Sequence, residues 1–123
     1  MSSPQDREQP LLPDPNAVRV LWLRKAAKRY LGAAYSDTAW FVMLALLTLG
    51  SRSKGSSIRH VSARADVPRN TGLRALRKLE RAGFVTFSPN RNDARAVAVQ
   101  LTPAGVQTAL NVANAVEAGV VRF

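Results

Sequence analysis

The segment NTGLRALRKLERAGFV, residues 70–85, constrains the fold of this chain more than any other. Its apolar stripe repeats every three residues, as it does along one side of a helix, and consists of Leu73, Leu76 and Leu79. At about 100° per residue, the polar and basic side chains fall on the opposite side. Gly83 supplies a left-handed residue that ends the helix. The sequence therefore predicts a helix over residues 70–83 with one buried face and one cationic face.

Positive charge is concentrated around this helix. The 123 residues contain 18 Lys and Arg against 8 Asp and Glu, a formal net charge of +10 at pH 7. Residues 52–95 hold eleven of the cations and three of the acids, which leaves a net charge of +8 in this part alone. A charge clustered in this way favours a phosphate-rich partner over general solubility.

The composition argues against several other classes of protein. There is no cysteine, so disulfides and thiolate metal sites are excluded, and His60 is the only histidine. No glycine-rich phosphate loop and no closely spaced pair of carboxylates is present, so we expect no catalysis, cofactor or metal. The most apolar stretch, residues 39–49, is about half as long as a membrane span. The proline-rich start is not typical of a signal peptide. We expect a cytoplasmic, nucleoid-associated protein.

The order of expected elements begins with helices. Residues 1–16 contain four prolines and are expected to form a disordered arm before a single domain over residues 17–121. An amphipathic helix is expected over residues 17–31, and a nearly all-apolar helix follows the cap Ser36 as the buried centre of the domain. A short helix over 58–65, a turn at 66–68 and the basic helix then form a helix-turn-helix over residues 57–83.

The periodicity changes after Gly83. Aromatic and β-branched residues alternate on both sides of a turn at residues 89–93, which predicts a β-hairpin over 84–101 with a basic tip. Thr102 and Pro103 then start a last helix, expected over 103–120. A helix-turn-helix followed by a hairpin with an arginine at its tip is a winged helix. The predicted fold class is α+β, mostly helical, with a two-stranded β-hairpin wing.

Two motifs resemble the MarR-type winged-helix transcription regulators. Asp93-Ala94-Arg95 followed by Leu101-Thr102-Pro103-Ala104-Gly105 is similar to the wing of that family, D-x-R, a short strand and L-T-x-x-G. Leu79-Glu80-Arg81-Ala82-Gly83-Phe84-Val85 is similar to the end of its recognition helix, L-E-x-x-G-[LF]-V. The resemblance covers roughly residues 18–118. It implies a sequence-specific transcription regulator that binds double-stranded DNA, with repression as its expected action.

The resemblance also implies which residues meet DNA. The exposed face of helix 70–83 would enter the major groove, where arginine suits guanine and asparagine suits adenine; the residues expected near the bases are Asn70, Thr71 and Arg74. Phosphate contacts are expected from Arg69, Arg77, Lys78 and Arg81. On the wing, Arg95 is expected in the minor groove, with Asp93 able to pair with its guanidinium and Arg91 at the tip. An ordinary hairpin ion pair is the alternative for Asp93 and Arg95.

Two residues depart from the family pattern. Gly72 stands where the family has an aliphatic side chain, and we expect it to permit a close approach by helix 58–65. Phe87 stands where a basic residue is common, either packed on the hairpin or exposed as a contact. The first helix and the single last helix are also short. The apolar residues of the last helix cover more than the one stripe that packing on a small domain needs. We therefore expect a homodimer through the first and last helices, with packing inside the monomer as the alternative.

Other functions stay open at this level. The resemblance leaves room for a small-molecule effector, and four aromatic residues are either the lining of its pocket or plain core: Trp22, Tyr30, Tyr35 and Trp40. The charge of +10 suits an architectural protein that coats DNA or RNA without sequence preference equally well. A replication or partition factor of a plasmid or phage would have the same fold, since the fold does not determine the function.

Overall fold

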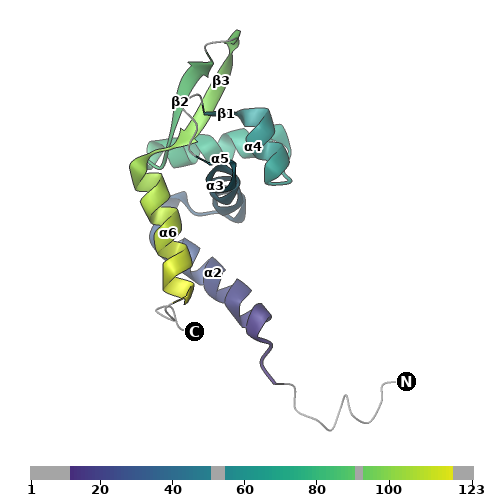
Figure 1. Cartoon of the computed structure of the whole chain (residues 1–123), viewed down its shortest axis with the longest axis vertical. Helices are drawn as coiled ribbons and strands as arrows, with labels where there is room; N and C mark the ends of the chain where they lie inside the picture. The colour runs from purple at the N-terminus through teal and green to yellow at the C-terminus, as the bar shows by residue number, and fades with distance from the viewer. Residues whose placement is uncertain (1–11, 51–54, 91–92, 118–123) are drawn as a thin grey trace, which may run out of the picture.

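The fold is taken from a computed structural model of the chain, which describes residues 12–50, 55–90 and 93–117. Figure 1 shows a hairpin at one end of the molecule, a group of helices beneath it, and two helices that extend toward the other end. In chain order the elements are α2 (Pro15–Leu31), the 3-10 turn η1 (Gly32–Ala34), α3 (Asp37–Leu49), β1 (Ser56–Ser57), α4 (Ile58–Arg64), α5 (Arg69–Arg81), β2 (Val85–Asn90), β3 (Asp93–Leu101) and α6 (Pro103–Glu117).

Helix α2 begins earlier than the sequence predicts. The Asp14 carboxylate accepts hydrogen bonds from the backbone N–H groups of Asn16 and Ala17, each at 2.9 Å. Pro15 occupies the first helical position, where its missing N–H removes no helical hydrogen bond. The expectation of a disordered arm up to residue 16 is therefore wrong at its end, because Asp14 and Pro15 form a cap. Residues 1–11 lie outside the described part of the chain.

A polar cluster joins α2 to the start of α3. The Tyr35 hydroxyl donates a hydrogen bond to the Asp37 carboxylate, and Arg24 Nε lies 3.5 Å from Asp37 Oδ1. Burial of the Tyr35 ring, followed by its bond to Asp37, raises the pKa of this tyrosine. The hydrogen bond with Tyr35 and the charge of Asp37 raise the pKa of Arg24. At neutral pH the cluster thus has one ion pair and one neutral phenol, which link α2 to the start of α3 at the surface.

The hydrophobic core is centred on α3. As predicted, this helix is buried on most of its surface, with Ala39, Trp40, Val42, Met43, Ala45 and Leu46 all inside. Phe41 is the exception, since half of it (51%) is exposed. Helices α4, α5 and α6 pack around α3, and α2 packs mainly on α6.

The helix-turn-helix depends on a close approach between α4 and α5. A Cβ built on Gly72 would overlap the Ser62 hydroxyl and lie 3.0 Å from the Ser62 Cβ. The expectation that Gly72 permits this approach is confirmed. In the turn between the helices, Asp66 has a φ of +58°, and Pro68 stands at the N-cap position of α5, which begins at Arg69.

Helix α5 ends at a glycine, as the sequence predicts. Gly83 has a φ of +85°. Its N–H bonds the carbonyl of Glu80 at 2.9 Å, and the N–H of Phe84 bonds the carbonyl of Leu79 at 2.9 Å. This pair of bonds is the Schellman motif, which turns the chain sharply from helix to strand. It fixes the direction in which the wing leaves α5.

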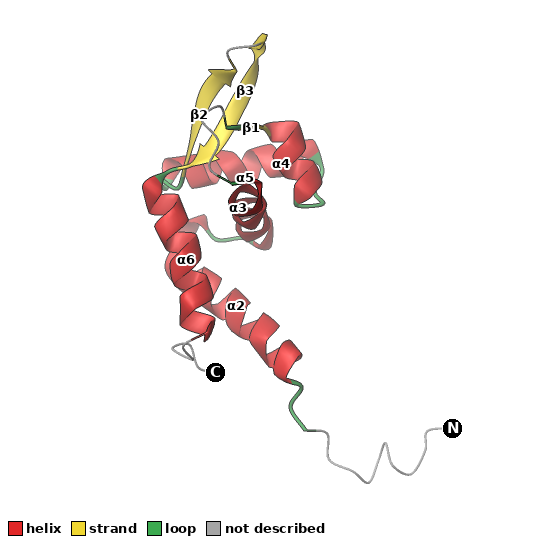
Figure 2. Ribbon diagram, in the orientation of Figure 1, coloured by secondary structure: helices red, strands yellow, loops and turns green. Residues whose placement is uncertain are grey.

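The wing is the antiparallel hairpin β2–β3, drawn in yellow in Figure 2. Within the described residues the sheet has three strands in the order β1-β3-β2, because Ser56 and Ser57 pair with Val99 and Ala98. The prediction of a two-stranded sheet therefore omitted the short strand β1. The two serines have no alternating apolar pattern, so only their position beside β3 makes them a strand. Along β2–β3 the register shifts between Pro89 and Asn90.

The L-T-x-x-G motif joins the wing to α6. Thr102 Oγ1 donates to the Gly83 carbonyl at 2.6 Å and accepts from the Gly105 N–H at 3.0 Å. A Cβ on Gly105 would overlap the Phe84 carbonyl oxygen, so only glycine fits this approach. The motif thus connects the end of α5, the start of β2 and the start of α6. Helix α6 is described to Glu117, so the predicted end at residue 120 lies outside the described residues.

Candidate nucleic-acid interface

The surface of α5 is divided as the sequence predicts. Gly72, Ala75, Leu76 and Leu79 are buried against the core. The opposite side is solvent-exposed and carries Asn70, Thr71, Arg74, Arg77, Lys78 and Arg81, with Arg69 exposed at the helix start. We call these seven residues the α5 cationic face. The one acid in the helix is Glu80.

The α5 cationic face is presented by a rigid element. Gly72 against Ser62 fixes the distance of α5 from α4, and the Schellman motif fixes its end. Leu76 and Leu79 are fully buried beneath it. In Figure 1 helix α5 lies at the base of the wing. A polyanion bound there would meet side chains on a fixed backbone.

Arg77 differs from the other cations of this face. Its Nη1 donates to Glu80 Oε1 at 3.1 Å, an ion pair between neighbouring turns of α5. Its guanidinium carbon also lies 4.2 Å from the centroid of the Phe87 ring on β2. Phe87 is half-buried and packs against the core, so its ring is not a freely exposed contact. Arg77 therefore has two contacts inside the protein.

Two more arginines are exposed on α4, the helix before α5. Arg59 and Arg64 are both exposed on this short helix, which packs against α5. Neither was among the predicted site residues. Their signal in the sequence was the clustered charge of residues 52–95, which did not by itself place either side chain on the surface.

The wing residues are described only in part. The backbone of Asp93 and Arg95 belongs to β3, and Asp93 stands opposite Asn90. The side chains of Asp93 and Arg95 lie outside the described part of the structure, and so does Arg91. The pairing of Asp93 with Arg95 stays a prediction.

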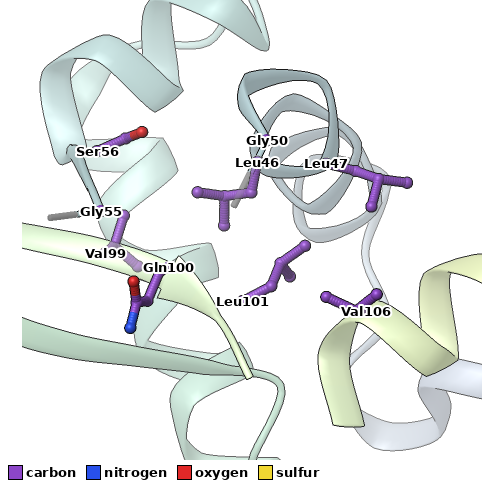
Figure 3. Close-up of a pocket in the computed structure, with 9 residues that line it drawn as sticks. All are labelled: Leu46, Leu47, Gly50, Gly55, Ser56, Val99, Gln100, Leu101 and Val106. Carbon is purple, nitrogen blue, oxygen red and sulfur yellow. The ribbon is translucent and has the colours of Figure 1, made fainter. Parts of the chain in front are cut away.

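A cavity in the described part of the structure lies away from the aromatic residues that were expected to line a pocket. It has a volume of about 160 Å³ between the end of α3, the β1–β3 edge and the start of α6. Figure 3 shows Leu46, Leu101 and Val106 around it. None of the four expected aromatic residues lines this cavity. Trp40 is core, Trp22 and Tyr35 are half-buried against it, and Tyr30 is exposed.

The two extended helices leave apolar side chains exposed. On α2, Val20 is 64% and Leu21 55% exposed, although the helix packs on α6. On α6, Leu110 is 41% exposed next to the buried Ala109 and Val112. Packing inside the monomer therefore covers only part of the apolar surface of these helices.

Two further properties concern the described residues alone. They contain no group of three His, Asp or Glu side chains placed to bind a metal ion. Among them no single helix has both the length and the apolar composition for crossing a membrane. The segments Pro15–Ala34 and Asp37–Leu49 reach that length and composition only when taken together, and they meet at a bend of 101°.

Comparison with known proteins identifies the kind of domain. Residues 41–105 match the family model described as a winged helix DNA-binding domain. No curated protein matches the sequence.

Solved structures share the fold over most of the chain. A MarR family transcription regulator has a TM-score of 0.68 at 18% identity over 85% of this chain. A mutant of MepR from S. aureus bound to an oligodeoxyribonucleotide has a TM-score of 0.68 at 14% identity, over 89% of this chain and 80% of its own. Wild-type MarR from E. coli has a TM-score of 0.61 at 19% identity, over 87% and 78%. The match spans 64% of the first regulator's length.

Proposed function

The chain belongs to the family of winged helix DNA-binding domains, and we propose from this premise that it is a sequence-specific transcription regulator that acts as a repressor. The observation that carries the proposal is the α5 cationic face on a rigid helix beside a hairpin wing. The fold it shares with MarR family transcription regulators supports the proposal. So does the similar structure that is bound to an oligodeoxyribonucleotide.

Helix α5 reads the major groove in this proposal. Asn70, Thr71 and Arg74 lie in the first half of the helix, and all three are exposed. Arginine binds guanine through two hydrogen bonds and asparagine binds adenine in the same way, so Arg74 and Asn70 supply base-specific contacts. A helix anchored by Gly72 and Leu76 gives these side chains a fixed starting point.

Phosphate contacts come from the cations around this region. Arg69, Lys78 and Arg81 are exposed, and each phosphate neutralised adds about 0.9 to the slope of log affinity against log salt. On the wing, Arg91, Asp93 and Arg95 address the minor groove, where A·T-rich DNA concentrates negative potential. Binding is therefore expected to weaken steeply with salt.

Two copies of the chain bind DNA together in the proposed assembly. The exposed apolar side chains of α2 and α6, Val20, Leu21 and Leu110, form the interface. A two-fold dimer presents two copies of α5 to a palindromic site. A small-molecule effector would act on the geometry between these copies.

The test is a selection of DNA fragments by the purified protein at roughly physiological salt. A regulator enriches one discrete and palindromic sequence. The second candidate function, a coating protein without sequence preference, is favoured by the net charge of +10 and enriches no sequence. Equal recovery of unrelated fragments would overturn the regulator and favour the coating protein.

A further inference from the structure

We propose that Arg77 is a positioning residue, which fixes the wing relative to α5 through Phe87 and does not contact DNA phosphates. The inference rests on the proposed function, since it concerns how two DNA-contacting elements are kept in register. It changes the role that the sequence suggested for this arginine. The observations that carry it are one distance between two elements, one ion pair and the position of Arg77 on the helix.

Arg77 lies at the edge of the α5 cationic face. On a helical wheel it is about 60° from Arg74, on the side of the half-buried Leu73 and of Glu80. Lys78, the next residue, lies about 40° from Arg74 in the opposite direction. The two neighbouring cations therefore flank the face on different sides, and it is the side of Arg77 that meets β2.

Two groups determine where the Arg77 guanidinium lies. Its carbon stacks at 4.2 Å from the centre of the Phe87 ring, a distance within the range of cation–π contact. Its Nη1 bonds Glu80 Oε1 at 3.1 Å, which orients the planar group along the helix. Half of the side-chain surface remains exposed, as does 39% of Glu80, so the salt bridge alone is weak and the ring contact is needed to keep this position.

Phe87 transmits the position of Arg77 to the whole hairpin. Its backbone pairs with that of the fully buried Val99 across the β2–β3 ladder, and its side chain packs against the core. A contact between Arg77 and this ring therefore ties the middle of the wing to α5. The Gly83 turn and the Thr102 hydroxyl hold the base of the wing, and β1 pairs with β3. The contact with Arg77 adds a side-chain link between α5 and the middle of β2, and its loss should loosen β2 relative to α5.

The tie matters because DNA must meet α5 and the wing at the same time. A wing that is ordered before binding has less conformational freedom to lose in the complex. Loss of the tie should lower affinity without removing a contact to phosphate. Loss of a phosphate contact and loss of a positioning contact both lower the affinity. Only loss of a phosphate contact also lowers the salt slope.

The experiment compares Arg77→Ala with the matched control Lys78→Ala, which removes one exposed cation from the adjacent position. Affinity for the selected duplex is measured by fluorescence anisotropy across a range of salt. For Lys78→Ala the salt slope should fall by about 0.9. For Arg77→Ala the affinity should fall roughly three- to tenfold with the salt slope unchanged. Adding Phe87→Leu to this variant should cause little further loss of affinity, because the two residues act as one unit. Arg77→Met, which keeps the stem over the ring, should lose less.

Hydrogen exchange of the free protein supplies a readout that needs no DNA. The amides of β2 and β3 near Phe87 should exchange faster in Arg77→Ala than in the wild type, and Lys78→Ala should leave them unchanged. Unchanged exchange in Arg77→Ala overturns the inference. A slope that falls as far as in Lys78→Ala, with losses that add to those of Phe87→Leu, also overturns it. If the wild type binds no duplex, the proposed function is overturned instead. The hydrogen-exchange comparison then still tests whether the Arg77–Phe87 contact orders the wing.

Discussion

Gly72 shows how one residue sets the spacing of the helix-turn-helix. Glycine in the middle of a helix costs about 1 kcal/mol relative to alanine. Glycine is nevertheless required here, because the Ser62 side chain occupies the space where a Cβ on residue 72 would lie. The same hydroxyl is buried and lacks a hydrogen-bond partner within the described structure, which shows how closely the two helices approach.

Gly72→Ala is therefore expected to destabilise the protein although alanine favours helices. Overpacking a tight contact costs about 1–3 kcal/mol, which exceeds the gain in helix propensity. Urea unfolding followed by circular dichroism measures the change in the free energy of unfolding.

The matched control removes the obstacle on the other helix. Adding Ser62→Gly to Gly72→Ala should recover part of the lost stability, because the overlapping side chain is then absent. An alanine variant as stable as the wild type would show that α4 and α5 can separate without cost, and the account of this contact would then be wrong.

Residue-scale features could be predicted from the sequence where they depend on the backbone alone. The left-handed backbone of Gly83 and the close approach of two helices at Gly72 were both predicted, because a helix end and a tight helix crossing favour glycine. The partner of Arg77 was not predicted. Phe87 lies ten residues away in the next element, and its orientation depends on strand register and on the turn at Gly83.

At the scale of elements, Thr102 links three parts of the fold through one hydroxyl. It caps α6 at the Gly105 N–H and donates to the carbonyl of Gly83, at 3.0 and 2.6 Å. Helix caps are worth about 0.5–2 kcal/mol. The second bond connects this cap to the end of α5, so that the wing leaves and returns at a fixed separation.

Thr102→Val should consequently lower the free energy of unfolding by about 1–2 kcal/mol, since valine keeps the shape and loses both bonds. Thr102→Ser should restore most of it, because serine supplies the same hydroxyl oxygen. Thermal unfolding of the two variants side by side provides the measurement. Equal stability of valine and serine variants would contradict this role of the hydroxyl.

The helices could be predicted because each long one has an apolar stripe or a recognisable cap. The α5 prediction differs from the observed helix by one or two residues at each end. The earlier start of α2 was missed because four prolines suggested disorder, whereas Pro15 beside Asp14 is a helix start. Strand β1 was missed because two serines become a strand only through pairing with Val99 and Ala98 of β3.

At the scale of the whole molecule, the exposed apolar side chains of α2 and α6 predict association of two copies. A charge placed within the interface should separate them. Val20→Glu together with Leu110→Glu is expected to convert a dimer into a monomer, since a glutamate buried at an interface loses its hydration. Sedimentation measures the mass directly.

Phe41→Glu is the matched control, because Phe41 is also a half-exposed apolar residue but lies on α3. This variant should remain dimeric. A wild type that sediments as a monomer at micromolar concentration would contradict the proposed interface. So would a double variant that remains a dimer.

The central claim is that the α5 cationic face reads DNA sequence. The direct measurement is the ratio of affinities for the selected site and for a scrambled duplex of equal length, in wild type, Arg74→Ala and Lys28→Ala. Lys28 is an exposed cation on α2 and serves as the control for charge. A base contact by arginine is worth about 1–3 kcal/mol of discrimination, so Arg74→Ala should lower the ratio roughly five- to 150-fold, with Lys28→Ala unchanged. If Arg74→Ala weakens both duplexes equally and keeps the wild-type ratio, α5 does not read sequence through Arg74, and the claim is contradicted.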